Sequence, residues 1–378
     1  MPWKESSRMS SRLEFVMLAQ APGANIRALC RAFEISPKTG YKWLERFREQ
    51  GQEGLQDQSR RPLASPYRSS VELESRVLDL HDKYPCWGSR KLRALLPDTC
   101  DKPHPSTIDA ILRRHGRQIA GQEAAQQAAR NRFEHAAPNQ LWQMDFKGHF
   151  ALTDGRAGRC HPLTVLDDHS RFALCLSACG NETRHSVQQA LTDSFRRYGL
   201  PQRMTADNGP PWGARKGEGL SALEVWLIRL GIQVSHSRPY HPQTQGKDER
   251  FHRTLKLELL DRQGFHSLSA CQAAFDQWRH CYNLIRPHEA LGQQPPVSRY
   301  QNSARPFPEQ LPDLEYPASD HVLKVKSKGQ IHLKGKIVFI GEGLAGQQVA
   351  IRPSSIDGVL DVYFCHKHLR QIDLRNIA

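Results

Sequence analysis

The chain lacks a long apolar segment. No hydrophobic run reaches the ~18 residues that a helix needs to cross a bilayer. The first residues also lack the apolar core and small-residue cleavage site of a secretory signal. These absences argue against a helical membrane protein and against secretion, and we expect a soluble intracellular protein.

Cysteine motifs are missing as well. The nine cysteines are odd in number and include no C-x-x-C pair, which favours buried free thiols over a disulfide framework. Although the chain has 18 histidines, no histidine pair lies at zinc-finger spacing from a cysteine pair. The nearest cluster, Cys-His-Lys-His at 365–368, is too small for a tetrahedral zinc site, and we interpret it as the end of a strand.

Acidic residues are in short supply relative to basic ones. The 378 residues include 53 lysines and arginines but 39 aspartates and glutamates, so the formal net charge is +14. Such an excess favours a polyanionic partner, either nucleic acid or an acidic membrane surface. The length allows two to four domains.

A helix-turn-helix pattern occupies residues 11–50. After two short helices, Ser36 and Pro37 supply the N-cap and the first residue of a third. Its apolar face is expected to consist of Tyr41, Leu44 and Phe47. Its basic stripe consists of Lys38, Lys42 and Arg46. A tight turn before a helix with a basic stripe is the geometry that enters a major groove, and we expect DNA binding rather than a bundle with a solvated basic face.

A second helical unit follows a linker rich in Pro, Ser and Arg. Its helices are expected at 71–84, 89–96 and 106–115. The linker could follow a DNA backbone or minor groove, which Arg60 and Arg61 would contact. The last helix carries two further basic residues, Arg113 and Arg114. We interpret the unit as a second helix-turn-helix, so that two in tandem read a longer DNA site than one.

From residue 139 the pattern alternates between strands and helices. The expected order is three strands, a helix, a strand, a helix, a strand and two helices. This order describes a mixed sheet flanked by helices, an α/β layer fold. After a Pro-rich stretch, residues 320–377 alternate apolar and polar side chains between Gly-containing turns, which predicts a small all-β domain closed into a barrel.

The chain is therefore expected to be a multidomain α/β protein with six segments. These are a helix-turn-helix DNA-binding domain at 1–60, a second such domain at 68–118, a connector at 119–138, an α/β core at 139–294, a Pro-rich linker at 295–319 and a β-barrel domain at 320–378.

Three carboxylates of the core fall at places that a sheet can bring together. Asp145 lies in the first strand, Asp207 just after the fourth, and Glu249 on the helix after the fifth. Carboxylates gathered at one edge repel each other unless they bind cations. Hard oxygen ligands suit Mg²⁺ or Mn²⁺, and two such ions about 3.5–4 Å apart promote phosphoryl transfer.

The helix that carries Glu249 offers both a metal ligand and phosphate-binding cations. Glu249, Arg253 and Lys256 share one of its faces, although such a triple, taken alone, is more often a solvated face. Asp248 is the rival third ligand, and it would point about 100° away around the helix. Two further rival acids, which we interpret as turn residues, are Asp167 and Asp168.

The motifs around these acids resemble those of a known family. Asp145 in a strand, Asp-Asn-Gly at 207–209 and the segment 241–250 (HPQTQGKDER) resemble the DDE catalytic signature of retroviral integrases and integrase-type bacterial transposases. The pattern Asp-x-x-Ser-Arg at 167–171 resembles the family's turn between its second and third strands. Residues 282–292 (YNLIRPHEALG) resemble the segment that closes the core in insertion-sequence transposases.

Two comparisons with the family refine this resemblance. The N-terminal helix-turn-helix is similar to the insertion-sequence branch, whereas retroviral integrases begin with a zinc module that is not visible here. The interval between Asp207 and Glu249 is longer than is usual in the family, and residues 212–220 look like the insertion. A loop there would leave the site geometry intact.

The resemblance implies an RNase H-like core and a transposase. Such a protein binds the terminal inverted repeats of its insertion sequence, cleaves the DNA 3′ ends and joins them to target DNA. Asp145, Asp207 and Glu249 would be catalytic and would hold two Mg²⁺ ions, for which Mn²⁺ could substitute. The resemblance also implies a dimer or larger assembly on double-stranded DNA, in the bacterial cytoplasm at the nucleoid.

Basic residues from every part of the chain are candidates for DNA contacts. They are Lys38, Lys42, Arg46, Arg60, Arg61, Arg113, Arg114, Lys247, Arg250, Arg253 and Lys256. Two other functions stay open: a transposase-derived DNA-binding regulator without cleavage activity, and a ribonuclease H-like nuclease acting on RNA–DNA hybrids.

Overall fold

The structure is a computed structural model of the 378-residue chain. It describes residues 8–57, 68–98, 101–117, 134–153, 158–213, 219–236 and 246–375. The chain forms two compact units, Met1–Ser69 and Ser70–Ala378. Arg60 and Arg61, two of the expected DNA contacts, lie outside the described residues.

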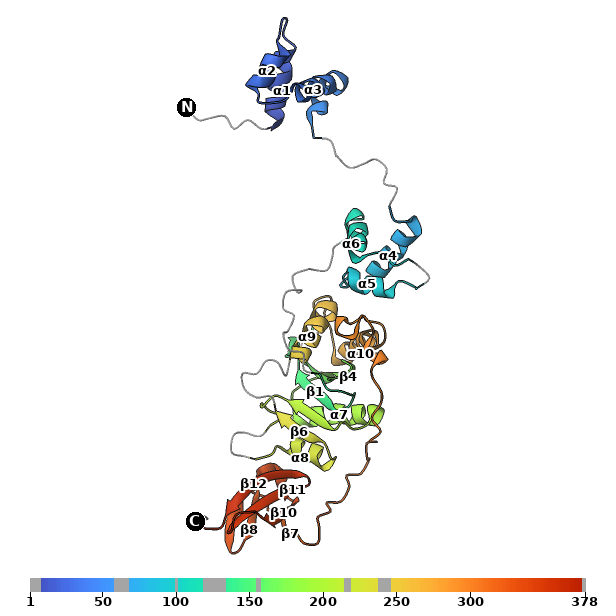
Figure 1. Ribbon diagram of the computed structural model, residues 1–378. Helices are drawn as coiled ribbons and strands as arrows, with labels where there is room; N and C mark the ends of the chain where they lie inside the picture. The colour runs from blue at the N-terminus through green and yellow to red at the C-terminus, as the bar shows by residue number, and fades with distance from the viewer. Residues whose placement is uncertain are drawn as a thin grey trace. The chain divides into compact units, whose positions relative to one another are not determined.

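The first unit is a three-helix domain (Figure 1). Its elements are α1 (Arg8–Ala19), α2 (Ile26–Ala32), α3 (Pro37–Gln50) and the 3₁₀ turn η1 (Gly51–Leu55). The Ser36 side chain accepts a hydrogen bond from the Thr39 N–H and caps α3, with Pro37 in the first helical position. The start of α3 is therefore as predicted from the sequence.

The buried face of α3 differs from the expected one. Trp43 and Leu44 are buried, whereas Tyr41 is 53% exposed. Gly40 explains the rotation, because a Cβ there would lie 2.5 Å from Cys30 Sγ, and this close approach makes Gly40, Trp43 and Leu44 the packed stripe. The expectation that Tyr41 faces inward is wrong.

A second group of helices begins the larger unit. It consists of α4 (Val71–Lys83), α5 (Ser89–Leu95) and α6 (Pro105–Arg114). Their apolar faces enclose a separate small core of buried side chains. Two side chains of this group contact a later part of the chain: Cys86 Sγ lies 3.5 Å from the Leu257 carbonyl oxygen, and Arg90 pairs with Glu289 at 3.1 Å.

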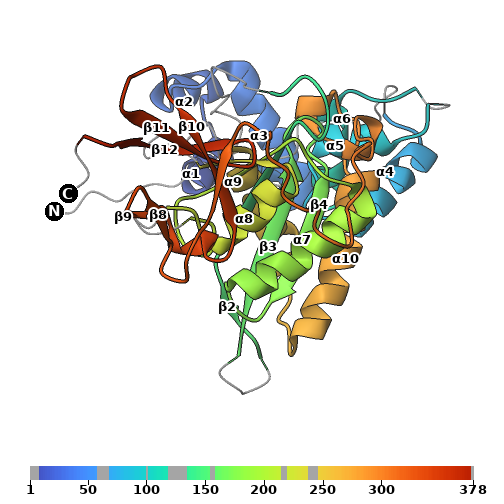
Figure 2. The same ribbon diagram turned by 90° about the horizontal axis from the view of Figure 1, so that it is seen from below.

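A six-stranded mixed sheet forms the centre of the larger unit (Figure 2). Its strands are β1 (Leu141–Phe146), β2 (Phe150–Ala151), β3 (Arg159–Asp167), β4 (Ala173–Cys179), β5 (Arg203–Ala206) and β6 (Gln233–His236). The order is β2-β3-β1-β5-β6, with β4 also paired to β3. β1 is antiparallel to β3 and parallel to β5, and β5 is parallel to β6.

Helices cover both faces of this sheet. They are α7 (Arg184–Tyr198), α8 (Ala222–Arg229), α9 (Gly246–Leu255) with its π-helical continuation (Lys256–Leu260), and α10 (Leu268–Leu284). Alternate residues of each strand point to opposite faces, so that Val165 packs with α7 and α8 while its neighbour Leu166 packs with α9 and α10. The result is the expected α/β layer fold.

The C-terminal part is all-β, but its closure into a barrel is not confirmed. Its strands are β7 (His321–Lys324), β8 (Gln330–Leu333), β9 (Lys336–Phe339), β10 (Gln348–Pro353), β11 (Val359–Phe364) and β12 (Lys367–Asp373). Among the described residues they form an open four-stranded sheet, β12-β11-β10-β7, and a separate β8–β9 hairpin. Buried side chains of these sheets belong to the same hydrophobic cluster as α7 and α8.

Candidate active site

The β1–β5 ladder places two of the predicted carboxylates side by side. The parallel register pairs Leu141 with Arg203 and Gln143 with Thr205. The same offset, continued by two residues, brings Asp207 beside Asp145 on one face of the sheet. Asp207 lies just past the end of β5, where its carboxylate accepts a hydrogen bond from the Gly209 N–H (3.0 Å) and closes a tight turn.

The proximity of the two aspartates appears in their electrostatics. Burial and, to a smaller extent, the nearby Asp207 carboxylate raise the pKa of Asp145 to about 6. The Asp145 side chain is nonetheless 28% exposed. A half-buried carboxylate beside a second one is stabilised by any cation that reaches both.

Asp145 also contacts Thr164 on β3 and lies near His252 on α9. Thr164 is the register partner of Asp145 across the antiparallel β1–β3 ladder, and its hydroxyl donates to the Asp145 carbonyl oxygen (2.9 Å). His252 of α9 contacts the same hydroxyl through Nε2 (2.8 Å), and its Nδ1 lies 3.9 Å from Asp145 Oδ2. These contacts join α9 to β1 next to the carboxylates.

Asp207 is held through its main chain by His236. The Nδ1 of His236, at the end of β6, lies 2.6 Å from the Asp207 carbonyl oxygen, and its Nε2 lies 2.9 Å from Glu224 Oε1. The hydrogen bond that His236 donates to the Glu224 carboxylate raises the pKa of His236. Because both ring nitrogens face oxygen acceptors, this arrangement favours a protonated ring that fixes the turn after β5.

The start of α9 is fixed by a buried ion pair. Lys247 Nζ pairs with the Asp168 carboxylate in the turn after β3 and lies 3.1 Å from the Asp168 carbonyl oxygen. Asp168 also accepts from Gln143 Nε2 (2.9 Å) and the His135 N–H (2.9 Å). Lys247, expected to contact DNA, is thus only 17% exposed and lies inside the protein.

Asp167 does act as a turn residue. Its carboxylate accepts hydrogen bonds from the Ser170 N–H (2.8 Å), the Ser170 hydroxyl (2.6 Å) and the Asn139 N–H (2.8 Å). Asp168 does more, because its carboxylate joins β1, the segment before it and α9. Only a tertiary contact reveals this, since the sequence places the two residues together in one turn.

Asp248 and Glu249 occupy different environments on α9. Asp248 is buried (2% exposed), and no described residue hydrogen-bonds its Oδ1. Burial raises the pKa of Asp248 well above its ordinary value, and the carboxylates of Asp145 and Asp168 raise it further. Glu249 is exposed. Asp248 therefore lies beneath the site, while Glu249 is the accessible acid of the pair.

The three predicted acids do not form a closed metal cage. Within the described ranges, no group of three or more His, Cys, Asp or Glu side chains is gathered tightly enough to hold an ion. Asp145 and Asp207 fit a divalent cation, because they supply hard oxygen donors and because burial, together with the Asp207 carboxylate, raises the pKa of Asp145.

The residues predicted to contact DNA differ in solvent exposure and in their contacts within the protein. Exposed residues include Lys38, Arg250, Arg253 and Lys256. Lys42 and Arg46 lie over the Trp43 ring, 4.9 and 5.3 Å from its centroid. Arg113 and Arg114 are both exposed, but Arg114 pairs with the buried Glu74.

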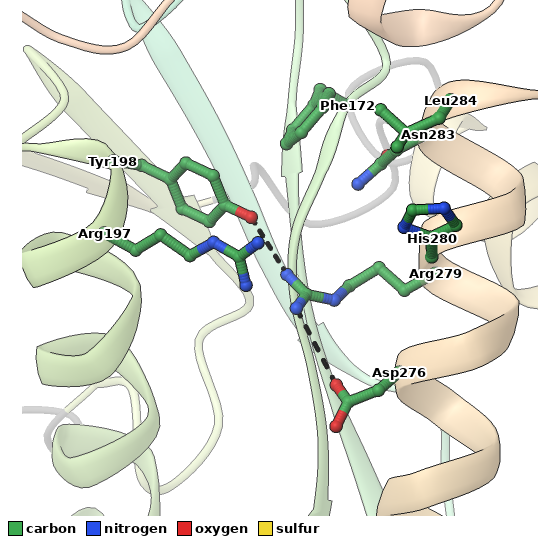
Figure 3. A pocket seen from close by; sticks show the side chains of 8 residues that line it. All are labelled: Phe172, Arg197, Tyr198, Asp276, Arg279, His280, Asn283 and Leu284. Carbon is green, nitrogen blue, oxygen red and sulfur yellow. Dashed lines mark hydrogen bonds and ion pairs between the residues drawn. The ribbon is translucent and has the colours of Figure 1, made fainter.

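A cavity of about 310 Å³ lies apart from these acids. It lies between α7 and α10, and Figure 3 shows Arg279 extending across it. The Arg279 guanidinium lies 3.2 Å from Tyr198 Oη and 3.7 Å from Asp276 Oδ1, and it also donates to the Leu174 carbonyl oxygen. The arginine thus ties α10 to α7 and β4, and the cavity shares no residue with the acidic site.

Comparison with known protein families now gives this architecture a class. Residues 135–242 and 230–296 match two families described as Integrase core domain. Residues 11–62 match a Helix-turn-helix domain and residues 39–112 a Homeodomain-like domain. Residues 320–377 match the C-terminal domain of the IS481 family transposases. The protein thus joins DNA-binding helix-turn-helix domains to an integrase-type core, a class of core that transfers nucleotidyl groups.

Individual relatives point to one kind of mobile element. The chain is 28% identical over 231 residues to an uncharacterized 31.7 kDa protein of insertion element IS407 from Burkholderia multivorans, covering 60% of this chain and 80% of the relative. It is 26% identical over 264 residues to an uncharacterized 39.2 kDa protein of insertion element IS476 from Xanthomonas euvesicatoria, covering 67% and 74%. The family matches and these relatives support a bacterial insertion-sequence transposase with an integrase-type core.

One solved structure matches part of the chain. The HTLV-2 integrase catalytic core domain in complex with magnesium matches with a TM-score of 0.34 at 17% identity, covering 44% of this chain and 100% of that chain. Separately, no helix in the described ranges is both long and apolar enough to cross a membrane.

Proposed function

We propose that the protein is an active DDE transposase that cleaves and joins DNA. The observation that carries this proposal is the pairing of Asp145 and Asp207 at the same level of adjacent parallel strands, next to the helix that bears Glu249. Asp145, Asp207 and Glu249 would hold two Mg²⁺ ions, or Mn²⁺ in their place. When bound, such ions activate an attacking oxygen and stabilise a leaving oxygen in phosphoryl transfer.

Two reactions would follow in sequence at this site. In the first, water attacks the phosphodiester at the transposon end, which leaves a free 3′-hydroxyl and a 5′-phosphate. In the second, that hydroxyl attacks a phosphodiester of the target DNA, whose own 3′ oxygen leaves. The exposed Arg250, Arg253 and Lys256 would contact the DNA backbone beside the acids.

The remaining domains would place DNA at this site. We propose that residues 1–60 and 68–118 read the terminal inverted repeats, with 119–138 as a connector to the core at 139–294. After the linker at 295–319, the β domain at 320–378, whether or not it closes into a barrel, would add sequence-independent contacts. Because two ends must be cut and joined together, the working form would be at least a dimer on bacterial DNA in the cytoplasm.

The test is cleavage of DNA that carries the element's inverted repeats, with Mg²⁺. Wild type is expected to release the 3′ end, and Asp145→Asn, Asp207→Asn and Glu249→Gln are expected to lose at least 10³-fold in rate. Lys38→Ala serves as the control that weakens DNA binding and spares the chemistry. Equal cleavage by wild type and Asp145→Asn would remove the catalytic assignment. Binding without any metal-dependent cleavage would indicate a transposase-derived regulator.

Asp248→Asn tests the register of the third acid. Asp248 is buried beneath the site and Glu249 is exposed, so the Asn variant should retain cleavage within about tenfold of wild type while Glu249→Gln does not. Equal losses in the two variants would show that the helix presents a different acid. A preference for RNA–DNA hybrid over duplex DNA would instead indicate a ribonuclease.

A further inference from the structure

The hydrogen bonds around Thr164 fix the tautomer of His252. The Thr164 hydroxyl donates its one proton to the Asp145 carbonyl oxygen (2.9 Å), so it must accept the hydrogen bond from His252 Nε2 (2.8 Å). Nε2 therefore carries the ring hydrogen, and Nδ1 keeps a lone pair.

The free lone pair of His252 lies next to the Asp145 carboxylate. Nδ1 and Asp145 Oδ2 are 3.9 Å apart, and both are acceptors, so neither can donate to the other. Within the described part of the chain, no group donates a hydrogen bond to Nδ1. Two adjacent lone-pair donors of this kind are satisfied together by a cation or by a proton donor that lies between them.

We propose that His252 Nδ1 is a further donor atom of the cation site, at its Asp145 end. This proposal rests on the proposed function, because it assumes that Asp145 holds a divalent ion. His252 lies three residues after Glu249 on α9. One histidine thus joins α9 to the β1–β3 ladder through Nε2 and offers a nitrogen ligand through Nδ1. Imidazole nitrogen favours transition-metal ions over Mg²⁺, so the site should bind Mn²⁺ in preference to Mg²⁺.

The direct test is pulsed electron spin resonance of the full-length protein with one equivalent of Mn²⁺. Nitrogen modulation of the Mn²⁺ spin echo is expected in wild type. His252→Asn should still bind Mn²⁺, because the amide oxygen lies near the former position of Nδ1, but the modulation should disappear. Wild-type Mn²⁺ without nitrogen modulation, or modulation that persists in His252→Asn, would overturn the proposal.

A matched variant separates the ligand role from the tether to Thr164. The amide of His252→Gln can reach Thr164 but places no atom at Nδ1, so its half-saturating Mn²⁺ concentration should rise about tenfold or more, with a smaller change for Mg²⁺. If Gln restores wild-type Mn²⁺ binding and Asn does not, His252 is a tether only.

Asp145→Asn distinguishes failure of this proposal from failure of the proposed function. If Mn²⁺ binding is lost in Asp145→Asn but unchanged in both histidine variants, the assignment of His252 alone is wrong. If Asp145→Asn binds Mn²⁺ as wild type does, the cation site itself is wrong, and the histidine assignment falls with it.

Discussion

Lys247 at the start of α9 is paired with Asp168, whose side chain is 1% exposed, in the turn between β3 and β4. The contact holds the helix that carries Glu249 against the strand that carries Asp145. Burial lowers the pKa of Lys247, with a further lowering by Arg171, while the hydrogen bond to Asp168 opposes that change. The pair is therefore a structural element of the site.

Lys247→Met should destabilise the protein strongly. It leaves the Asp168 carboxylate buried without its cation, which costs about 3–5 kcal/mol in the free energy of unfolding. Arg250→Met, an exposed change on the same helix, should cost less than about 0.5 kcal/mol. Chemical denaturation of both variants measures the difference, and similar values would show that the ion pair does not hold α9.

Removal of the Asp145 charge should change the pH dependence of stability. The pKa of Asp145 is raised to about 6 in the folded protein, so the folded state holds this proton more tightly than the unfolded state does. Its contribution to stability is therefore complete below about pH 4 and is lost as the pH rises through about 6. Without divalent ions, Asp145→Asn should be the more stable protein at pH 7–8, by about 1–3 kcal/mol.

Urea denaturation between pH 4 and pH 8 checks this sign. The wild-type curve should fall with pH by more than the Asp145→Asn curve, and Asp313→Asn, a change at an exposed position, should follow wild type. Added Mg²⁺ should stabilise wild type and leave Asp145→Asn unchanged. A variant less stable than wild type at pH 8 would contradict the raised pKa of Asp145.

Two neighbouring arginines on α6 should act differently. Arg114 pairs with Glu74, whose side chain is 7% exposed and also contacts His115, so Arg114→Ala should lower the free energy of unfolding by about 2 kcal/mol. Arg113 is exposed, so Arg113→Ala should instead weaken DNA binding and reduce the salt slope by about one. Thermal melts and salt titrations of DNA binding would show the reverse if Arg114 contacts DNA.

Gly343 should be intolerant of a side chain. A Cβ there would lie 2.2 Å from the Leu220 carbonyl oxygen, just before α8. Gly343→Ala should therefore disturb the packing of the β domain on the core and cost about 1–3 kcal/mol. Gly88→Ala adds a methyl group with no atom within 4 Å and is the control. Equal melting temperatures would mean that this close approach is absent in solution.

Local sequence signals predicted the elements that depend on local chemistry. Ser36 and Pro37 mark the start of α3, and the strand and helix order of the core follows from apolar periodicity. The register that pairs Asp145 with Asp207 is consistent with the motif that singled them out, although their role in catalysis stays a prediction.

Tertiary contacts were beyond the reach of the sequence. Nothing in the local sequence distinguishes Asp168 from Asp167. Their roles differ because Asp168 pairs with Lys247, which is 79 positions away in the sequence. Tyr41 was assigned to the wrong face because Gly40, without a side chain, is the residue that sets the packing of α3. His252 was missed since its partners lie on β1 and β3, although a histidine on the buried face of the helix after Glu249 is a usable signal.

The constant offset between β1 and β5 has a consequence for how such a protein can vary. The two aspartates are aligned by backbone hydrogen bonds of neighbouring strands, and α9 is located by Lys247 and His252. Neither arrangement depends on how many residues join Asp207 to Glu249. Natural insertions, or an affinity tag introduced between β5 and α8, can therefore change the length of that segment without displacing the acids.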